Sequence, residues 1–173
     1  MKALRTLGTV AVTGTVLAIL PLGSAMAASS GDTTATFTLA GGSLDVTTAA
    51  GAALTNAAPG AASVSGSLGA VGVSDTRGST AGWVMSAAST TFVDGAGSVS
   101  TGVSYDSGEA TASTGTVTPT TTGATSITTG APVAEGTLAS GNNTASYTPT
   151  LTVTLPASAL AGDYTGTVTT SIL

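Results

Sequence analysis

The feature that most constrains the fold is a regular alternation of apolar residues with threonine near the C-terminal end. Over residues 147–155, Tyr, Pro, Leu, Val and Leu occupy the odd positions and threonine occupies the even ones. Successive side chains of a β-strand point to opposite faces, so this pattern predicts a strand with one buried and one solvated face. Pro149 has no amide hydrogen, which places it at an edge or at the beginning of the strand.

Shorter alternating runs occur earlier in the chain and are separated by residues that form turns. The runs lie at residues 37–39, 44–46, 71–73 and 99–105, and clusters of Gly, Asp, Asn and Pro lie between them. Antiparallel hairpins need only a few connecting residues, whereas parallel strands need long crossovers. The pattern therefore predicts an all-β, antiparallel sandwich or barrel with Gly/Thr-rich loops.

Three further segments carry weaker predictions. The Ala-rich residues 49–58 are the candidate for a helical turn. Residues 111–130, rich in Thr, Ser and Gly, are either a long surface excursion or a pair of poorly packed edge strands. The last ten residues predict a strand that runs to the C-terminus, and Tyr164 at its start resembles the corner tyrosine of immunoglobulin-like sandwiches.

The N-terminal residues have the pattern of an export signal. Lys2 and Arg5 precede an apolar stretch over residues 7–22, and Ala25-Met26-Ala27 provides small residues on both sides of a cleavage site. We therefore expect residues 1–27 to be a secretory signal peptide and residues 28–173 to form a single domain. No second long apolar run follows, so no membrane span is expected after cleavage.

The charge balance after cleavage disfavours anionic partners. Arg77 is then the single cation against eight Asp and Glu residues. Binding to nucleic acid depends on cations that neutralise phosphates, and an anionic membrane surface attracts the same groups. The sequence therefore predicts neither a nucleic-acid partner nor a membrane partner.

The chain also lacks cysteine and histidine. Disulfides, thiolate metal sites and a cysteine nucleophile are therefore excluded, and so is the usual general base near neutral pH. Without Lys in the processed chain, the many hydroxyl groups have no ordinary activating base. Asp94, Asp106 and Glu109 lie near Gly-rich turns, but their spacing does not match a calcium loop. We expect no enzyme activity, no cofactor and no metal.

Arg77 and the only tryptophan, Trp83, lie close together in the chain. Trp83 either stacks on a sugar ring or packs in the interior, where its size contributes most to a core that is short of large side chains. Arg77 either binds a carboxylate of a partner, pairs locally with Asp75, or makes a cation–π contact with Trp83. Interior packing of Trp83 is favoured, and for Arg77 a local role in the turn is favoured, either the pair with Asp75 or the cation–π contact with Trp83.

The sequence around these residues resembles the first motif of WxL domains. The resemblance rests on Asp75-Thr-Arg77-Gly, then Gly-Trp83-Val-Met85, with Met85 where those domains usually carry Leu, and on Phe92 on the expected next strand. Residues 147–156 resemble the second motif, with Val where a second Trp is usual. The two motifs occur in the family's order over nearly the whole processed chain.

The resemblance implies an immunoglobulin-like β-sandwich that Gram-positive bacteria export and hold noncovalently on the cell wall. The partner would be peptidoglycan or cell-wall proteins. If the two tryptophans of the family form part of a wall-binding surface, the loss of one would affect wall attachment and leave the fold intact. The candidate surface-binding or motif residues are Asp75, Arg77, Trp83, Met85, Tyr147, Leu151 and Leu155.

Two functions remain open at the level of sequence. The first is a non-enzymatic exported surface protein that associates with the cell wall. The alternative is a structural subunit of a surface fibre or coat, in which copies self-associate through the edges of their strands.

Overall fold

The computed structural model describes residues 30–95, 97–98, 102–110 and 112–173. The predicted signal peptide lies outside these residues. The chain separates into two units, Met1–Phe37 and Thr38–Leu173. Residues 30–37 of the first unit have no regular secondary structure, and the second unit contains ten described strands and no described helix. All strand pairs are antiparallel, which confirms the predicted all-β sandwich class.

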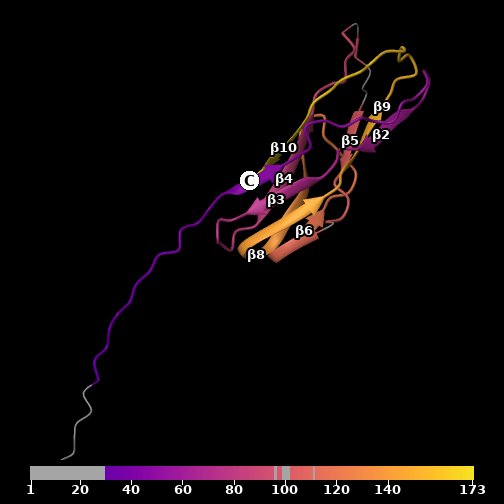
Figure 1. Ribbon diagram of the computed structural model, residues 1–173. Helices are drawn as coiled ribbons and strands as arrows, with labels where there is room; N and C mark the ends of the chain where they lie inside the picture. The colour runs from indigo at the N-terminus through magenta and orange to yellow at the C-terminus, as the bar shows by residue number, and fades with distance from the viewer. Residues whose placement is uncertain (1–29, 96, 99–101, 111) are drawn as a thin grey trace, which may run out of the picture. The chain divides into compact units, whose positions relative to one another are not determined.

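The first sheet has six strands arranged around one long strand, β8 (Figure 1). Its neighbours follow the order β1-β3-β8-β4-β10, and β6 pairs with β8 as well. The C-terminal part of β8 pairs with β3, its N-terminal part pairs with β4, and β6 follows both parts. The strands are β1 (Leu44–Thr47), β3 (Val71–Asp75), β4 (Trp83–Ser89), β6 (Ala112–Thr121), β8 (Ala131–Tyr147) and β10 (Val168–Ile172).

The pairing of β6 with β8 is irregular at its centre. Its register shifts on both sides of Thr116, as at β-bulges, where one strand carries an extra residue and bends. In the same region of β8, Leu138 has a φ of 52° and Gly141 a φ of 69°. Leu138 is 79% exposed there, so its side chain contributes nothing to the core.

The second sheet has four strands in the order β2-β9-β5-β7. It faces the first sheet across the apolar core. The strands are β2 (Ser63–Ser67), β5 (Gly102–Asp106), β7 (Thr125–Ser126) and β9 (Thr150–Thr154).

Both sheets contribute alternate residues to the core, as the sequence pattern predicts. The fully buried large side chains include Trp83, Met85 and Tyr147 from the first sheet and Tyr105 and Leu151 from the second. Burial of such side chains contributes about 1.5–3 kcal/mol each, so a few large residues account for much of the stability of this Thr/Ser/Gly-rich chain.

The single strand predicted over residues 147–155 is in fact two strands. Tyr147 ends β8 in the first sheet, and Thr150 begins β9 in the second. Pro149, which cannot donate to a ladder, lies at this crossing, so its predicted place before a strand is correct. The chain changes sheets here, and its odd-numbered residues from Tyr147 to Val153 stay buried, whereas Leu155 is partly buried.

Several segments differ from their predicted structure. The run at residues 37–39 forms no strand, and the Ala-rich residues 49–58 form no helical turn. Phe92 lies in the connection after β4 and not on a strand. The described part of residues 111–130 contains β6 and β7, which supports the edge-strand alternative over the surface excursion. The final strand begins at Val168, later than the pattern suggested.

Candidate functional site

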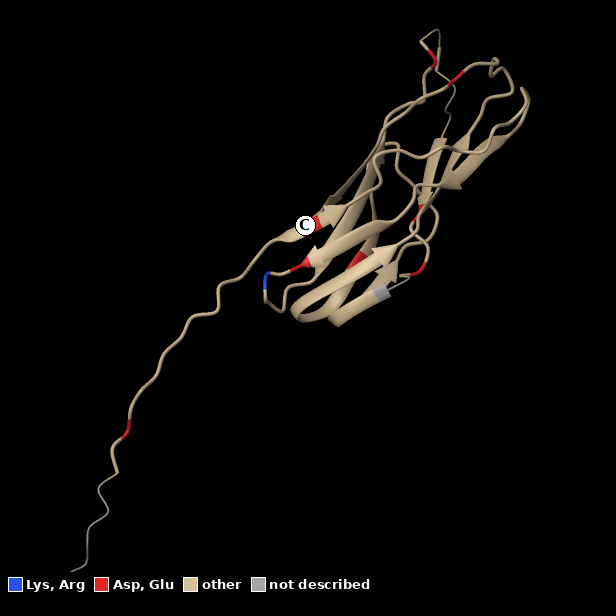
Figure 2. Ribbon diagram, viewed as in Figure 1, with Lys and Arg blue, Asp and Glu red and all other residues tan. Residues whose placement is uncertain are grey.

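The turn between β3 and β4 holds the only cation among the described residues (Figure 2). Arg77 donates from Nε to Asp75 Oδ1 and from Nη2 to Asp75 Oδ2, both at 2.9 Å, and its backbone N–H donates to the same carboxylate at 3.0 Å. Nη2 also donates to the carbonyl oxygens of Ala81 and Gly82, at 3.3 and 2.9 Å. The local role predicted for Arg77 is therefore confirmed in the form of the pair with Asp75, and its guanidinium closes the turn.

The environment of this pair favours the charged forms of both groups. Hydrogen bonds from Arg77 hold the pKa of Asp75 below its ordinary value, and the Asp75 carboxylate raises the pKa of Arg77. The side chain of Asp75 is 2% exposed and that of Arg77 is 28% exposed. A buried carboxylate needs such partners, and the bidentate geometry provides them.

Asn143 joins this pair to the tryptophan. Its Nδ2 donates to Asp75 Oδ2 at 3.4 Å and to the carbonyl oxygen of Gly141 at 3.3 Å, and its Oδ1 accepts a hydrogen bond from Trp83 Nε1 at 3.2 Å. Asn143 is 3% exposed. No local sequence signal pointed to Asn143, because Ser-Gly-Asn-Asn is a common turn pattern that does not indicate which Asn is buried.

Trp83 belongs to the interior. It is 2% exposed, and its ring meets that of Tyr147 edge to face, with centroids 6.5 Å apart and planes at 84°. The indole also lies against Gly136, where a Cβ would overlap it. Trp83 is therefore not positioned to stack on a sugar, and the alternative of interior packing is the one that holds.

The other candidate residues are divided between the core and its margin. Met85, Tyr147 and Leu151 are 0, 0 and 1% exposed, so they are not surface contacts in this fold. Leu155 is half-buried and lines a groove described below. The candidate residues are thus mainly structural.

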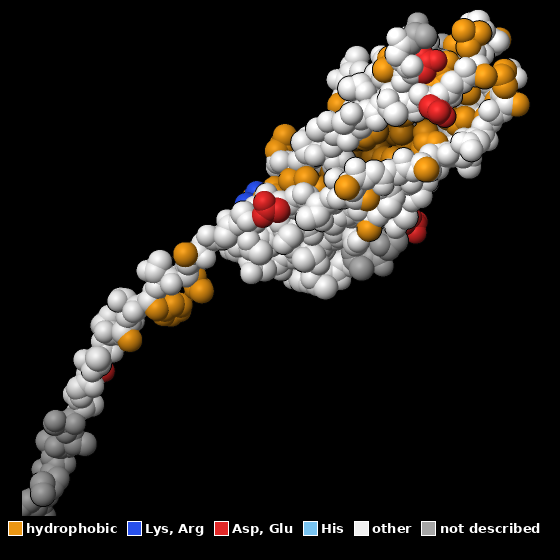
Figure 3. Space-filling view, turned by 45° about the horizontal axis from the view of Figure 1, so that its top comes forward, with side chains coloured by type: hydrophobic (Ala, Val, Ile, Leu, Met, Phe, Trp, Pro, Cys, Tyr) orange, Lys and Arg blue, Asp and Glu red, His pale blue; other side chains and the backbone are white. Residues whose placement is uncertain are grey.

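A groove with an almost uncharged lining, partly polar and partly apolar, opens between the two sheets on the side of β10. We call it the interlayer groove; it lies between residues 48–60 and residues 159–170. It consists of two recesses of about 210 and 540 Å³, which share Leu54 and Phe92. Figure 3 shows a hollow of hydrophobic side chains on the body.

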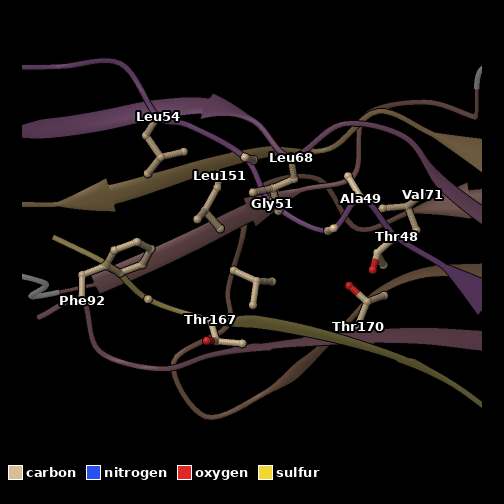
Figure 4. Close-up of a pocket in the computed structure, with 14 residues that line it drawn as sticks. Thr48, Ala49, Gly51, Leu54, Leu68, Val71, Phe92, Leu151, Thr167 and Thr170 are labelled. Carbon is tan, nitrogen blue, oxygen red and sulfur yellow. The ribbon is translucent and has the colours of Figure 1, made fainter. Parts of the chain in front are cut away.

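The walls of the interlayer groove are almost free of charge. Asp163 is the one charged residue among those that line it. Figure 4 shows Leu54, Phe92 and Leu151 turned toward the same space, with Thr167 and Thr170 of the C-terminal segment on the opposite side. This arrangement suits an uncharged ligand better than an ion.

Two of the three carboxylates near Gly-rich turns accept hydrogen bonds within their own turns. Asp94 accepts from the backbone N–H of Gly97, and Asp106 accepts from that of Gly108, each at 2.9 Å. No cluster of three or more potential metal ligands occurs within the described ranges. The Tyr164 hydroxyl donates to the carbonyl oxygen of Leu160 at 3.0 Å, as the resemblance to a corner tyrosine predicts.

The chain matches no protein-family model, no curated protein and no solved structure. Across the described residues, no helix has the length and apolarity to cross a bilayer. The likeness to WxL domains therefore rests on the motif residues of the sequence alone.

Proposed function

We propose that this chain is a non-enzymatic exported surface protein that associates noncovalently with the cell wall, through peptidoglycan or through proteins bound to it. The observation that carries the proposal is the contact between the two WxL-like motifs. Trp83 of the first motif packs edge to face on Tyr147 of the second, although 64 positions separate their numbers in the chain. Motifs that are distant in sequence and joined in space are expected if they define one domain type.

The same packing changes where the wall would be bound. Since Trp83 and Met85 are buried, the contacts must come from exposed groups, which on this protein are mainly Thr and Ser hydroxyls and the rim of the interlayer groove. In the described part of the chain the only cation, Arg77, is already paired with Asp75, so little positive charge is left to attract wall polyanions. Hydrogen bonding and apolar contact should therefore dominate, and both are less sensitive to salt than ion pairing is.

Cosedimentation of the chain without residues 1–27 with purified Gram-positive sacculi tests this proposal. We expect the folded protein to sediment with sacculi at low salt and equally in molar salt. An acidic β-sandwich protein of unrelated sequence serves as the control for nonspecific trapping. Binding no greater than that of the control, or binding that salt abolishes, would refute the proposal.

A second candidate function is that of a structural subunit in a surface fibre or coat. It is favoured by a specific observation, the exposure of Phe37 and Leu39 to solvent at 85 and 88%. Exposed apolar residues in an alternating segment are suited to pairing between copies. Sedimentation velocity over a range of protein concentrations distinguishes this function from wall binding by monomers, because only assembly depends on concentration.

A further inference from the structure

The strand β6 forms one margin of the first sheet. Among the described strands it pairs with β8 alone, so the side of its backbone that faces away from β8 has no strand paired with it. We call this side the outer edge of β6. An edge of this kind presents unpaired N–H and C=O groups and can accept a strand from another molecule.

Charge does not protect this edge. The ten residues of β6, Ala-Ser-Thr-Gly-Thr-Val-Thr-Pro-Thr-Thr, include no Lys, Arg, Asp or Glu, and sheets often carry charged side chains along exposed edges. Glu135 contacts Thr120 through its side chain, but it belongs to β8 and lies one strand further in. Threonine and valine also favour extended structure. The composition alone would therefore suit pairing between two copies of this edge.

The hydrogen bonds of β6 identify the residues that face outward. The backbone N–H of Thr122, directly after β6, donates to the carbonyl oxygen of Val133 at 3.3 Å. Backbone groups alternate in direction along a strand, so the even-numbered residues of the adjoining part of β6 also face β8. Val117, Pro119 and Thr121 then direct their backbone groups to the outer edge.

The other side of β8 leads to the same assignment. Val84 of β4 exchanges N–H to O hydrogen bonds with Leu173 at 2.8 and 3.1 Å, so the adjacent Trp83 directs its backbone groups to β8. Trp83 pairs with Gly136, which also lies opposite Pro119. The backbone groups of Gly136 point toward only one of the two neighbouring strands, and that strand is β4. Pro119 therefore faces outward.

Pro119 places a residue without an N–H at the centre of the outward-facing positions. The N–H groups of Val117 and Thr121 point the same way, but between them the carbonyl oxygen of an added strand would meet the proline ring instead of a donor. Pairing with β8 is unaffected, because an outward residue makes no ladder bond on that side. The pairing register also shifts on both sides of Thr116, and Gly115 has a φ of 73°. The regular part of the edge is therefore short and is interrupted by proline.

We propose that Pro119 keeps the outer edge of β6 from pairing with the same edge of a second copy. Two identical edges meet antiparallel about a two-fold axis, and a register centred on residue 119 places Val117 of one copy opposite Thr121 of the other. In that register the two prolines face each other, and the central pair lacks both of its hydrogen bonds. The exposed Thr118 and Thr120 would otherwise form favourable cross-strand contacts. The inference goes beyond both candidate functions, and in a fibre or coat the copies would have to meet at another place.

Replacement of the proline tests the proposal. In the chain without residues 1–27, Pro119→Thr supplies the missing N–H, and the two hydrogen bonds that the central pair gains should lower the dissociation constant of the dimer by about 30-fold or more. Sedimentation velocity should show a monomer for the unaltered chain at concentrations where the variant is a dimer. The matched control combines Pro119→Thr with Thr121→Pro, which moves the proline to the next outward position and should restore the monomer.

Far-ultraviolet circular dichroism and the emission of Trp83 check that both variants keep the fold of the unaltered chain. A Pro119→Thr variant that stays monomeric at every soluble concentration overturns the proposal. Equal dimerisation of this variant and of the control with the moved proline overturns it as well, because the contact would then not depend on N–H groups along the outer edge.

Amide hydrogen exchange locates the contact between copies. In the unaltered monomer, the N–H groups of Val117 and Thr121 should exchange rapidly and those of Thr118 and Thr120 slowly, because only the second pair faces β8. In the Pro119→Thr dimer, Val117 and Thr121 should become protected. Slow exchange of these two amides in the unaltered monomer would show that the edge is already covered, and the proposal would fall.

The same measurement separates this inference from assembly of the unaltered chain. If the unaltered chain forms oligomers while Val117 and Thr121 still exchange rapidly, the copies meet at another surface and the proposal stands. If those oligomers protect the two amides, Pro119 does not close the edge and the proposal is wrong.

Discussion

Replacement of Asn143 by Ala gives the sharpest test of how the two motifs are connected. The substitution removes the acceptor of the Trp83 indole N–H and one of the donors to the Asp75 carboxylate. A buried donor left without a partner costs about 1–3 kcal/mol, and loss of the longer contact to the carboxylate adds about 1 kcal/mol. The free energy of unfolding should therefore fall by about 2–4 kcal/mol.

Asn142 provides a matched control, since it is the same residue type at the adjacent position of β8 and is exposed. Its replacement by Ala should change the free energy of unfolding by about 0.5 kcal/mol or less. Urea unfolding followed by far-ultraviolet circular dichroism measures both variants on one scale, with the slope of the transition as a check that the two-state description holds.

A double-mutant cycle with Trp83→Phe isolates the hydrogen bond between the indole and the amide. Phe keeps an aromatic ring and removes the N–H, so Asn143→Ala should cost less in that background by about 1 kcal/mol or more. Additive effects of the two substitutions, or equal costs for the two asparagines, would refute the proposed link between the motifs.

Three other perturbations follow from the core. Gly136→Ala should destabilise the protein by about 1–3 kcal/mol because the added Cβ overlaps the Trp83 indole, whereas Gly102→Ala, which meets only ordinary contacts, should not; urea unfolding compares them, and equal effects would contradict the packing. Tyr147→Phe should leave the free energy of unfolding unchanged or raise it, because the buried Tyr147 hydroxyl has no hydrogen-bond partner among the described residues. A decrease of more than about 1 kcal/mol in the free energy of unfolding would contradict this expectation. Burial raises the pKa of Tyr105 and of Tyr147 to about 12, so the unfolded chain loses these protons first and stability should fall as the pH rises from about 10 to about 12. Phenolate absorbance measures this titration, and ionisation of all the tyrosines near pH 10 in the folded protein would be inconsistent with it.

The strand pattern predicts much of the fold because alternation reports burial directly. Threonine at every even position of residues 147–155 correctly identifies Tyr147, Leu151 and Val153 as part of the core. Alternation does not report where a strand changes sheets, because the inward residues face the same core before and after the crossing. The pattern therefore did not predict that the chain changes sheets at Pro149. The proline itself was compatible with the beginning of a strand, and β9 begins one residue after it.

The site was less predictable, for reasons that lie in distant contacts. The pair of Asp75 and Arg77 could be anticipated because two positions separate its members, and its turn is self-contained. Asn143 joins that turn only because β3 and β8 are neighbours, which no local pattern indicates. The interlayer groove likewise depends on the packing of segments 48–60 and 159–170, neither of which contains a strand before Val168.

The same reasoning explains the run at residues 37–39. Its alternation is real, but a strand forms only where a neighbour supplies backbone partners, and the isolated chain supplies none at this place.

The central claim is that the WxL-like residues build the interior and leave contacts with other molecules to the surface. Trp83 is the only tryptophan, so its fluorescence reports on that claim alone. In the folded chain without residues 1–27, we predict a blue-shifted emission that acrylamide barely quenches and that shifts to the red on unfolding in urea. Emission that is already red-shifted and freely quenched in the folded protein would contradict the claim.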